Sequence, residues 1–369
     1  MGYVYCMPEI WLNYGINDVV LDIQAENFDE KISNNGSILE DTKLIEKLDT
    51  LDLTKPLELV ISNYSNSVQK VLTKIFEKCE EKSISKPKIF AQKRIINLIK
   101  EYNPEDSVIS EFEANSLENS NLVFIGEMEF NGLFGFDTIS TRLLKQFGNE
   151  KMLEAFSKRN GDLPCPGKEV PSIQIAKEFT DSFDISSIEI ISNTNGLLDL
   201  EVGHPSKTMS IAKSFANTAL TQTEKHRTFI VSTGKDSSND SFSKSLNSIW
   251  NIYNSVKNDG FVILLAECKI GIGSDAIQQY IDGRITVERI KNSTKYVDGM
   301  EDLLYLQEIQ KKFHMGLVSI LPEFYLKKLD IKLLDGIKKS LDYILKIHGP
   351  NQKIKVIEDG ARVILEGKN

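Results

Sequence analysis

Two turns that follow apolar segments carry residue types that could bind a ligand. The turn at 232–236 brings hydroxyls, an ammonium group and a carboxylate together after an apolar run. The glycine turn at 271–274 follows another apolar run and could present backbone N–H groups to an anion. Open α/β sheets bind ligands outside the carboxyl ends of their strands, so both turns are candidate ligand-binding segments. The alternatives are a polar connecting loop and a plain tight turn. The residues that we assign to ligand binding in these turns are Thr233, Gly234, Lys235, Gly271, Gly273 and Ser274.

The spacing of histidine and cysteine residues does not indicate a metal site or an acid–base pair. A local metal site would show an HxxxH or CxxC pattern, and neither occurs. The four histidines are scattered, so each is interpreted as a surface or capping residue, although the fold could still gather them. The four cysteines are far apart, which favours reduced thiols in a cytosolic compartment over a disulfide framework. We therefore predict no metal site.

Alternating strand and helix patterns indicate the scaffold that positions the two turns. Short apolar runs bounded by polar or turn residues have the length of buried strands. Segments of helical period lie at 68–79 and 246–253, and another begins at Ile331 and includes Leu334 and Leu345. This alternation predicts an α/β fold with mainly parallel sheets. The predicted strands are 57–61, 121–125, 188–191, 228–231 and 261–265.

The two ends of the chain add further elements. The β-rich runs 9–14 and 18–23 predict an N-terminal β-hairpin. The last helix ends before Pro350, and two short strands, 353–357 and 361–365, follow it. Proline and glycine make 161–171 an irregular loop. We place the domain boundary between a helix at 206–221 and the strand at 228, which predicts domains 1–222 and 223–369 with a ligand cleft between them.

Composition bounds the possible functions. With 369 residues and 41% hydrophobic content, the chain can bury a sizeable core. The net charge of −9 gives no broad basic surface, so we predict no nucleic-acid partner. There is no basic N-terminal region followed by an apolar run, and no apolar segment long enough to span a bilayer. We therefore expect a cytoplasmic protein without a membrane partner; the oligomeric state stays open.

Several motifs occur in a characteristic order along the chain. In the segment 259–274, Asp259-Gly260, an apolar strand, Glu267-Cys268 and a Gly-x-Gly turn follow one another. This segment resembles the glycine-rich strand and turn that opens toward the ligand cleft in the nickel-pincer lactate racemase family. The segments 10–15 and 355–360 are similar to the opening strand and closing turn of that family. The resemblance spans nearly the whole chain and implies two α/β domains with an interdomain cleft.

The resemblance also implies a cofactor and catalytic groups. In the family, a pyridinium-type nucleotide tethered to a lysine carries nickel and accepts the substrate hydride, two histidines exchange a proton and a third ligates the metal. The segment 131–141 resembles the part that holds one proton-transfer histidine and the tethering lysine, which places Asn131 and Thr141 at these positions. An amide does not titrate near neutrality, and threonine has no amine for the tether. Lys145, one turn further on, is the remaining candidate for the tether.

The other family positions are replaced as well. The nickel-ligating histidine falls near Ser157, and the second proton-transfer histidine falls in a shortened loop around 90–94. The loop 63–67 resembles the family's phosphate and substrate loop, but only the hydroxyl residue Ser65 persists and the arginine that would bind a carboxylate is gone. The family's substrate-side glutamine and lysine fall at Lys244 and Asn251. We therefore assign Ser65 and Lys244 to the ligand cleft and predict no catalytic residues.

Three functions are compatible with this pattern. The first is a lactate racemase-like protein that has lost nickel-pincer chemistry and binds a small ligand or a protein partner in its cleft, with no cofactor. The second is an isomerase that still racemises or epimerises a 2-hydroxy acid with relocated groups and a nickel-pincer nucleotide. The third is a ligand-sensing regulator. We prefer the first, because the simultaneous loss of ligands and bases is difficult to reconcile with hydride and proton transfer.

Overall fold

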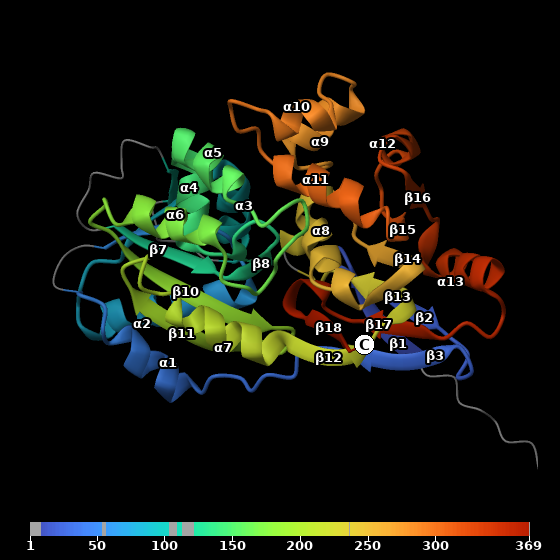
Figure 1. Ribbon diagram of the computed structural model, residues 1–369. Coiled ribbons are helices and arrows are strands. Elements are labelled where there is room, and N and C mark those ends of the chain that lie inside the picture. The colour runs from blue at the N-terminus through green and yellow to red at the C-terminus, as the bar shows by residue number, and fades with distance from the viewer. Residues whose placement is uncertain (1–8, 54–56, 103–108, 113–121, 236, 369) are drawn as a thin grey trace, which may run out of the picture. The chain divides into compact units, whose positions relative to one another are not determined.

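The computed structural model describes residues 9–53, 57–102, 109–112, 122–235 and 237–368, which fall into two compact units (Figure 1). The hairpin unit contains the described residues up to Asn34, Asn160–Pro166 and the chain from Ala219 onward. The central unit contains Asn35–Arg159 and Gly167–Thr218. The sequence predicted a single boundary between 222 and 223. In the structure the start of the chain joins the later unit, because β3 (Phe28–Ile32) pairs with β17 (Ile354–Ile357).

Among the described residues, the central unit forms a six-stranded sheet with the order β11-β10-β7-β4-β5-β6. Its pairs are parallel except for β10 and β11. The strand order reverses between β4 and β7, so their carboxyl ends flank the position where doubly wound sheets bind ligands. The strands are β4 (Glu58–Ile61), β5 (Lys88–Ala91), β6 (Ile109–Glu111), β7 (Leu122–Glu127), β10 (Ser186–Asn193) and β11 (Gly196–Gly203).

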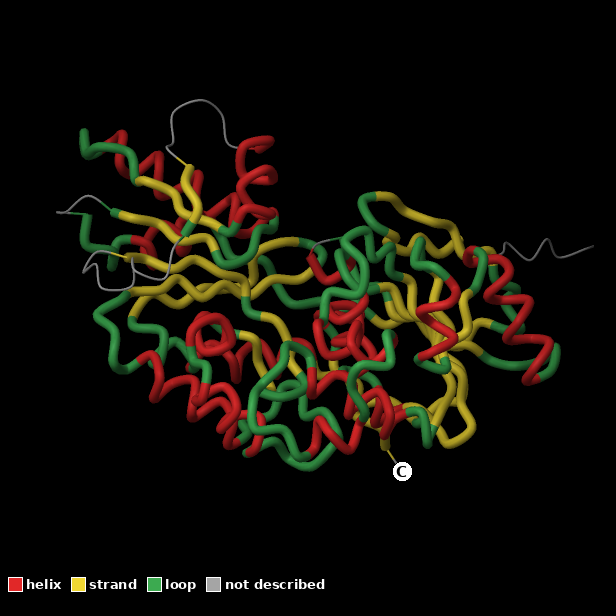
Figure 2. The backbone as a smooth tube through the Cα atoms, turned by 90° about the horizontal axis from the view of Figure 1, so that it is seen from above, coloured by secondary structure: helices red, strands yellow, loops and turns green. Residues whose placement is uncertain are grey.

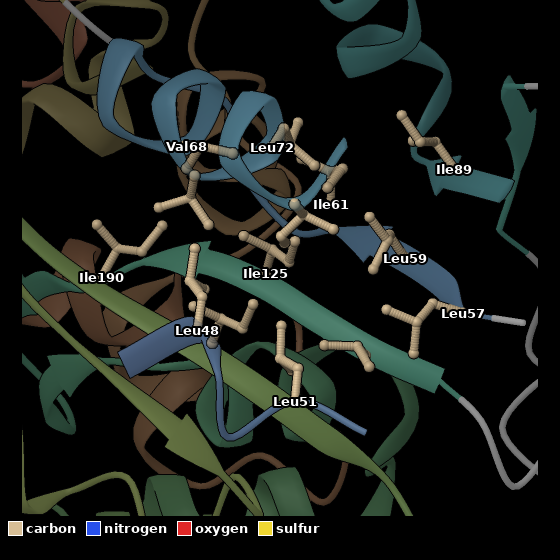
Figure 3. Close-up of a cluster of buried hydrophobic side chains, with 14 of the residues drawn as sticks. Leu48, Leu51, Leu57, Leu59, Ile61, Val68, Leu72, Ile89, Ile125 and Ile190 are labelled. Carbon is tan, nitrogen blue, oxygen red and sulfur yellow. The ribbon is translucent and has the colours of Figure 1, made fainter. Parts of the chain in front are cut away.

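Alternate residues of this sheet face two apolar layers. Leu59 and Ile61 belong to one layer and Val60 to the other, as the two-residue period of a strand requires. Figure 3 shows Ile61 beside Val68 and Leu72 of α2 in the first layer. The predicted helical face at 68–79 is confirmed, and α4 packs on the second layer. The helices are α1 (Asp41–Leu48), α2 (Asn66–Glu81), α3 (Lys93–Tyr102), α4 (Ile139–Phe147), α5 (Glu150–Ser157), α6 (Pro171–Thr180) and α7 (Ser210–Ala219), and a small hairpin joins β8 (Glu129–Asn131) to β9 (Gly135–Asp137).

The hairpin unit has its own sheet, which is six-stranded and entirely parallel over the described residues, with the order β16-β15-β14-β13-β17-β3. The predicted N-terminal hairpin is confirmed as β1 (Glu9–Tyr14) and β2 (Asn17–Asp22). Leu12 and Leu21 of the hairpin pack with Ile263 of the sheet and Ile344 of α13, which makes one apolar layer. The remaining strands are β13 (His226–Ser232), β14 (Val256–Leu265), β15 (Phe313–Val318) and β16 (Ile331–Leu333), with β12 (Leu220–Glu224) and β18 (Ile364–Lys368) as a separate pair.

The helices of the hairpin unit flank its strands. Helices are red and strands are yellow in Figure 2. They are α8 (Phe242–Trp250), α9 (Asp275–Ile281), α10 (Val287–Lys291), α11 (Met300–Ile309), α12 (Glu323–Lys328) and α13 (Gly336–His348). Short 3-10 turns occur at Ser237–Asn239, Tyr253–Ser255 and Gly360–Arg362.

The mainly parallel α/β class is confirmed, but several predicted elements end elsewhere. Ile331 lies in strand β16 and Leu334 follows that strand, because Ile331 pairs with Met315 of β15 before α13 begins. The helix predicted at 206–221 is shorter, because Leu220 already pairs with Ile364 in a strand. That pairing also moves the last strand from the predicted 361–365 to Ile364–Lys368.

No helix in the described part of the chain has both the length and the apolar character needed to cross a bilayer. Cys79, Cys165 and Cys268 are buried free thiols, while Cys6 lies outside the described residues.

Candidate functional site

The two predicted turns lie side by side at the carboxyl edge of the hairpin unit's sheet. β13 and β14 are neighbouring parallel strands, so the segments after Ser232 and Leu265 leave the sheet at the same edge. Asn239 joins them: its amide donates to the Gly234 carbonyl at 2.9 Å, and its Oδ1 accepts the Glu267 N–H at 2.6 Å. The sequence did not predict this positioning residue, because one amide in a polar loop has no distinguishing pattern.

The first turn mainly holds its own conformation. The Thr233 side chain is fully buried, and its hydroxyl donates to the last carbonyl of β14 at 3.4 Å. Its carbonyl accepts the Ser238 hydroxyl at 2.8 Å. Lys235 forms a partly exposed ion pair with Asp18 at 2.8 Å, and Asp236 lies outside the described residues. Thr233 therefore positions the turn, whereas Lys235 carries a solvent-accessible charge.

The glycine turn is organised around its carbonyl groups. The carbonyls of Gly271 and Ile272 accept the backbone N–H groups of Phe242 and Ser243 at 3.0 and 2.9 Å, at the start of α8. The Gly271 N–H itself donates to a carbonyl within the loop. Gly271 has φ of +89°, in the region where glycine is favoured over other residues. The carbonyl groups of this turn thus accept the first two backbone N–H groups of α8, which have no partner within the helix.

A hollow of about 380 Å³ opens at the glycine turn. Ser274 connects the glycine turn to α9 and to the turn before α11: its hydroxyl accepts the Ile277 N–H at 3.2 Å and donates to the Asp298 carbonyl at 3.1 Å. Among the described residues, the lining contains two carboxylates, Asp275 and Asp298, and no lysine, arginine or histidine. The lining residues are Ile270, Gly271, Ile272, Gly273, Ser274, Asp275, Gln278, Asp298 and Tyr325.

The predicted ligand residues are thus distributed over several places. Gly271, Gly273 and Ser274 line the hollow at the glycine turn, whereas Thr233, Gly234 and Lys235 lie in the neighbouring turn and outside its lining. Lys244 lies in the first turn of α8, where its N–H donates to the Ser241 hydroxyl at 3.4 Å. Ser65 belongs to the central unit.

In the central unit, side chains bridge the switch point between β4 and β7. The Asn63 amide donates to the Glu127 carbonyl at 3.0 Å, and its Oδ1 accepts the Glu127 N–H at 2.7 Å. Ser65 caps α2 by accepting the Val68 N–H at 3.2 Å and donates its hydroxyl to the Glu127 carboxylate. Glu127 is 1% exposed and also accepts the Ser192 hydroxyl. The retained hydroxyl of Ser65 is therefore used to bind a buried carboxylate of its own unit.

A second buried polar group lies on the α4 face of the same sheet. Arg142 donates to Asp137 at 3.0 Å and to the Glu127 carbonyl at 2.6 Å. Burial alone would raise the pKa of Asp137, but the Arg142 guanidinium beside it lowers that pKa below its ordinary value. Glu189 is fully buried, and one carboxylate oxygen accepts the Ile139 N–H at 2.6 Å while the other has no hydrogen-bond partner among the residues that the structure describes. Burial raises the pKa of Glu189 to about 7, although that N–H and Arg142 both oppose the rise.

The residues that the resemblance places at the positions of the racemase family's catalytic groups support local structure. The Asn131 Oδ1 accepts the N–H groups of Leu133 and Phe134, both at 2.9 Å, and so shapes the β8–β9 turn. Thr141 is fully buried and forms a capping box with Thr138 at the start of α4. The loss of the family's chemistry at these positions stays a prediction, and the hydrogen bonds of these side chains were not predicted from the sequence.

Restoring a lysine at position 141 is expected to destabilise the protein rather than create a tether. Thr141→Lys removes a hydroxyl that bonds to Asp137 at 3.0 Å and places an ammonium group at a site that is 0% exposed. We expect a loss of about 2–4 kcal/mol in the free energy of unfolding. Urea denaturation measures it, with Thr141→Ser as the control that keeps the capping hydroxyl. Equal stability of the two variants would contradict the buried capping role.

The fold and this edge geometry define a two-unit, mainly parallel α/β protein, and solved structures share that architecture. The lactate racemase apoprotein from Thermoanaerobacterium thermosaccharolyticum has a TM-score of 0.72 and 14% identity, over 97% of this chain and 100% of that one. A protein from Thermotoga maritima has a TM-score of 0.66 and 12% identity, over 90% and 99% of the two chains. No family model and no curated protein matches the sequence. The chain therefore has a lactate racemase-like fold.

The positions that the resemblance assigns to the lysine tether and the nickel-ligating histidine carry Thr141 and Ser157, whose side chains do not fit those roles. Thr141 is buried in its capping box, and the neighbouring candidate Lys145 lies 5.6 Å from the centre of the Phe134 ring. Ser157 donates its hydroxyl to the carbonyl of Glu154 at 2.6 Å. Within the described ranges, no group of three or more histidine, cysteine, aspartate or glutamate side chains is placed to hold a metal ion.

Proposed function

We propose that this chain is a lactate racemase-like protein that has lost nickel-pincer chemistry and binds a small molecule at the carboxyl edge of the hairpin unit. The observation that carries the proposal is the hollow of about 380 Å³ lined by Gly271, Gly273 and Ser274. These are three of the eight residues that the sequence pattern assigned to ligand binding. The hollow lies where parallel α/β sheets bind ligands, beyond the end of β14.

The structural roles of the residues at the replaced positions support the proposed loss of racemase chemistry. Thr141 and Asn131 are engaged in capping and turn formation, and Ser65 binds the buried Glu127. A carboxylate ligand such as a 2-hydroxy acid also finds no cation in the lining of the hollow, whereas Asp275 and Asp298 would repel it. The ligand of the hollow is therefore neutral or positively charged.

Thermal-shift screening of neutral polyols, amines, nucleotides and hydroxy acids tests the binding part of the proposal. A ligand at the hollow is expected to raise the melting temperature of the wild type but not of Gly271→Val. Gly283→Val is the matched control: both glycines have positive φ, +89° and +72°, and both have open space at the Cβ position, but Gly283 does not line the hollow. Identical ligand shifts in both variants would refute the assignment.

Intact mass and metal analysis test the loss of nickel-pincer chemistry. Protein made alongside the cofactor-synthesis enzymes is expected to have the mass of the bare chain and to leave lactate unracemised. Stoichiometric nickel with an adduct mass would overturn this part of the proposal and favour the alternative of an active 2-hydroxy acid racemase.

A further inference from the structure

We propose that a second pocket of the hairpin unit binds an uncharged, largely apolar small molecule. The pocket has a volume of about 430 Å³, within the range of small-molecule sites. It does not share lining residues with the hollow at the glycine turn, so the two proposals stand or fall separately. Its lining is Tyr14, Val19, Leu265, Val318, Ser319, Leu333, Leu334, Asp335, Gly336 and Ile337.

The position of this pocket is that of a ligand site in a parallel sheet. Leu265, Val318 and Leu333 are the last residues of the neighbouring strands β14, β15 and β16. Tyr14 and Val19, on the hairpin strands, and Ile337 in α13 supply further walls. The pocket therefore lies beyond the carboxyl ends of three adjacent parallel strands, where open α/β sheets leave room for ligands.

The residues that line the pocket favour a ligand with a largely apolar surface. Six of the lining residues, Val19, Leu265, Val318, Leu333, Leu334 and Ile337, have aliphatic side chains. Val19 and Ile337 are only partly buried although they pack against the apolar core of the unit, so an apolar molecule would remove further hydrocarbon surface from water. The contact between such a molecule and these walls is the main source of affinity.

The charges around the pocket exclude a carboxylate. Asp335 carries the charged group of the lining, and it is largely exposed and paired with Lys339. Burial, followed by the nearby Glu267 carboxylate, raises the pKa of the Tyr14 phenol, which therefore remains a neutral hydroxyl. The Ser319 hydroxyl already donates to the Glu267 carbonyl at 2.9 Å. An anion would lose its hydration against the apolar walls and lie near the Asp335 carboxylate, whereas a neutral hydroxyl compound avoids both costs.

A matched pair of probes tests the charge selectivity. Cyclohexylmethanol and cyclohexanecarboxylate have similar bodies and differ in charge, and their binding can be followed by chemical shift changes in NMR titrations. We expect cyclohexylmethanol to bind with a dissociation constant of about 1 mM and the carboxylate to bind at least about tenfold more weakly. Equal binding of the two probes, or no binding of the alcohol up to about 10 mM, would overturn the proposal.

Substitutions that fill the pocket test its location. Ile337→Trp and Val19→Trp each place an indole in the lining from a different element, and each is expected to weaken alcohol binding at least about tenfold. Ile347→Trp is the control on the same helix, because Ile347 is 43% exposed and outside the lining. Thermal melts show whether each filling variant is folded. If one of them is not, the affinity of the other for the alcohol tests the site. Unchanged affinity in a folded filling variant would refute the site, whereas failure of Gly271→Val to alter ligand shifts would refute only the glycine-turn hollow.

Discussion

Replacing Glu189 with glutamine is expected to stabilise the protein at pH 8 and to have little effect at pH 5. The pKa of Glu189 is about 7 in the folded chain, against an ordinary value of 4.5. The folded state therefore holds a proton that the unfolded state releases between these pH values, so its stability falls as the pH rises through this window. This difference between the folded and ordinary pKa values lowers the free energy of unfolding at pH 8 by about 3 kcal/mol, and the neutral glutamine does not incur that loss.

The geometry explains why a neutral group suits this position. The side chain is 0% exposed, and one oxygen accepts the Ile139 N–H while the other has no partner in the described part of the chain. Arg142 and Asp137, the charged groups that act on it, oppose one another in their effect on the pKa of Glu189. A glutamine keeps an acceptor for Ile139 and carries no charge to desolvate.

Urea denaturation of the wild type and Glu189→Gln at pH 5 and pH 8 measures this effect. Glu46→Gln on the exposed surface of α1 is the control, because it removes the same charge from the central unit without altering a buried group. If the stability difference between Glu189→Gln and the wild type were the same at both pH values, Glu189 would not be the titrating group.

Gly135→Ala is expected to cost about 4 kcal/mol or more in the free energy of unfolding. Gly135 has φ of +78°, and a Cβ atom there would lie 1.8 Å from the carbonyl oxygen of Lys168. The clash involves backbone that is held in place, because the Gly167 N–H donates to the Gly135 carbonyl at 2.8 Å. Relief requires the loop to separate from β9, which breaks this hydrogen bond.

Gly161→Ala separates the steric cost from backbone strain. Gly161 has φ of +71° but no atom within 4 Å of its Cβ position, so its substitution should cost about 1 kcal/mol. Chemical denaturation of both variants gives the comparison. A cost for Gly135→Ala as small as that of Gly161→Ala would show that the Lys168 carbonyl moves away easily.

The local pattern of the chain was sufficient for the α/β class and for most buried strands. Runs such as 229–231 and 261–265 are apolar throughout because both faces of these parallel strands are covered, and this signal does not depend on the rest of the fold. The helical face at 68–79 was predicted from its helical period and the hairpin β1–β2 from two β-rich runs, which are also local signals. Ile331 was misassigned because a three-residue edge strand is too short to interrupt a helical period.

For the site, residue types alone determined that Asn131 and Thr141 cannot exchange a proton or form a tether, and the local pattern predicted that the turns at 232–236 and 271–274 each follow a strand. That these two strands are neighbours is shown only by the pairing of β13 with β14. Tertiary structure decided what these residues do instead. Thr141 caps α4, Ser65 binds Glu127, and only the glycine turn, among the two predicted turns, borders the hollow of about 380 Å³. Hydrogen-bond partners, burial and cavities arise from segments far apart in sequence, which a local pattern does not encode.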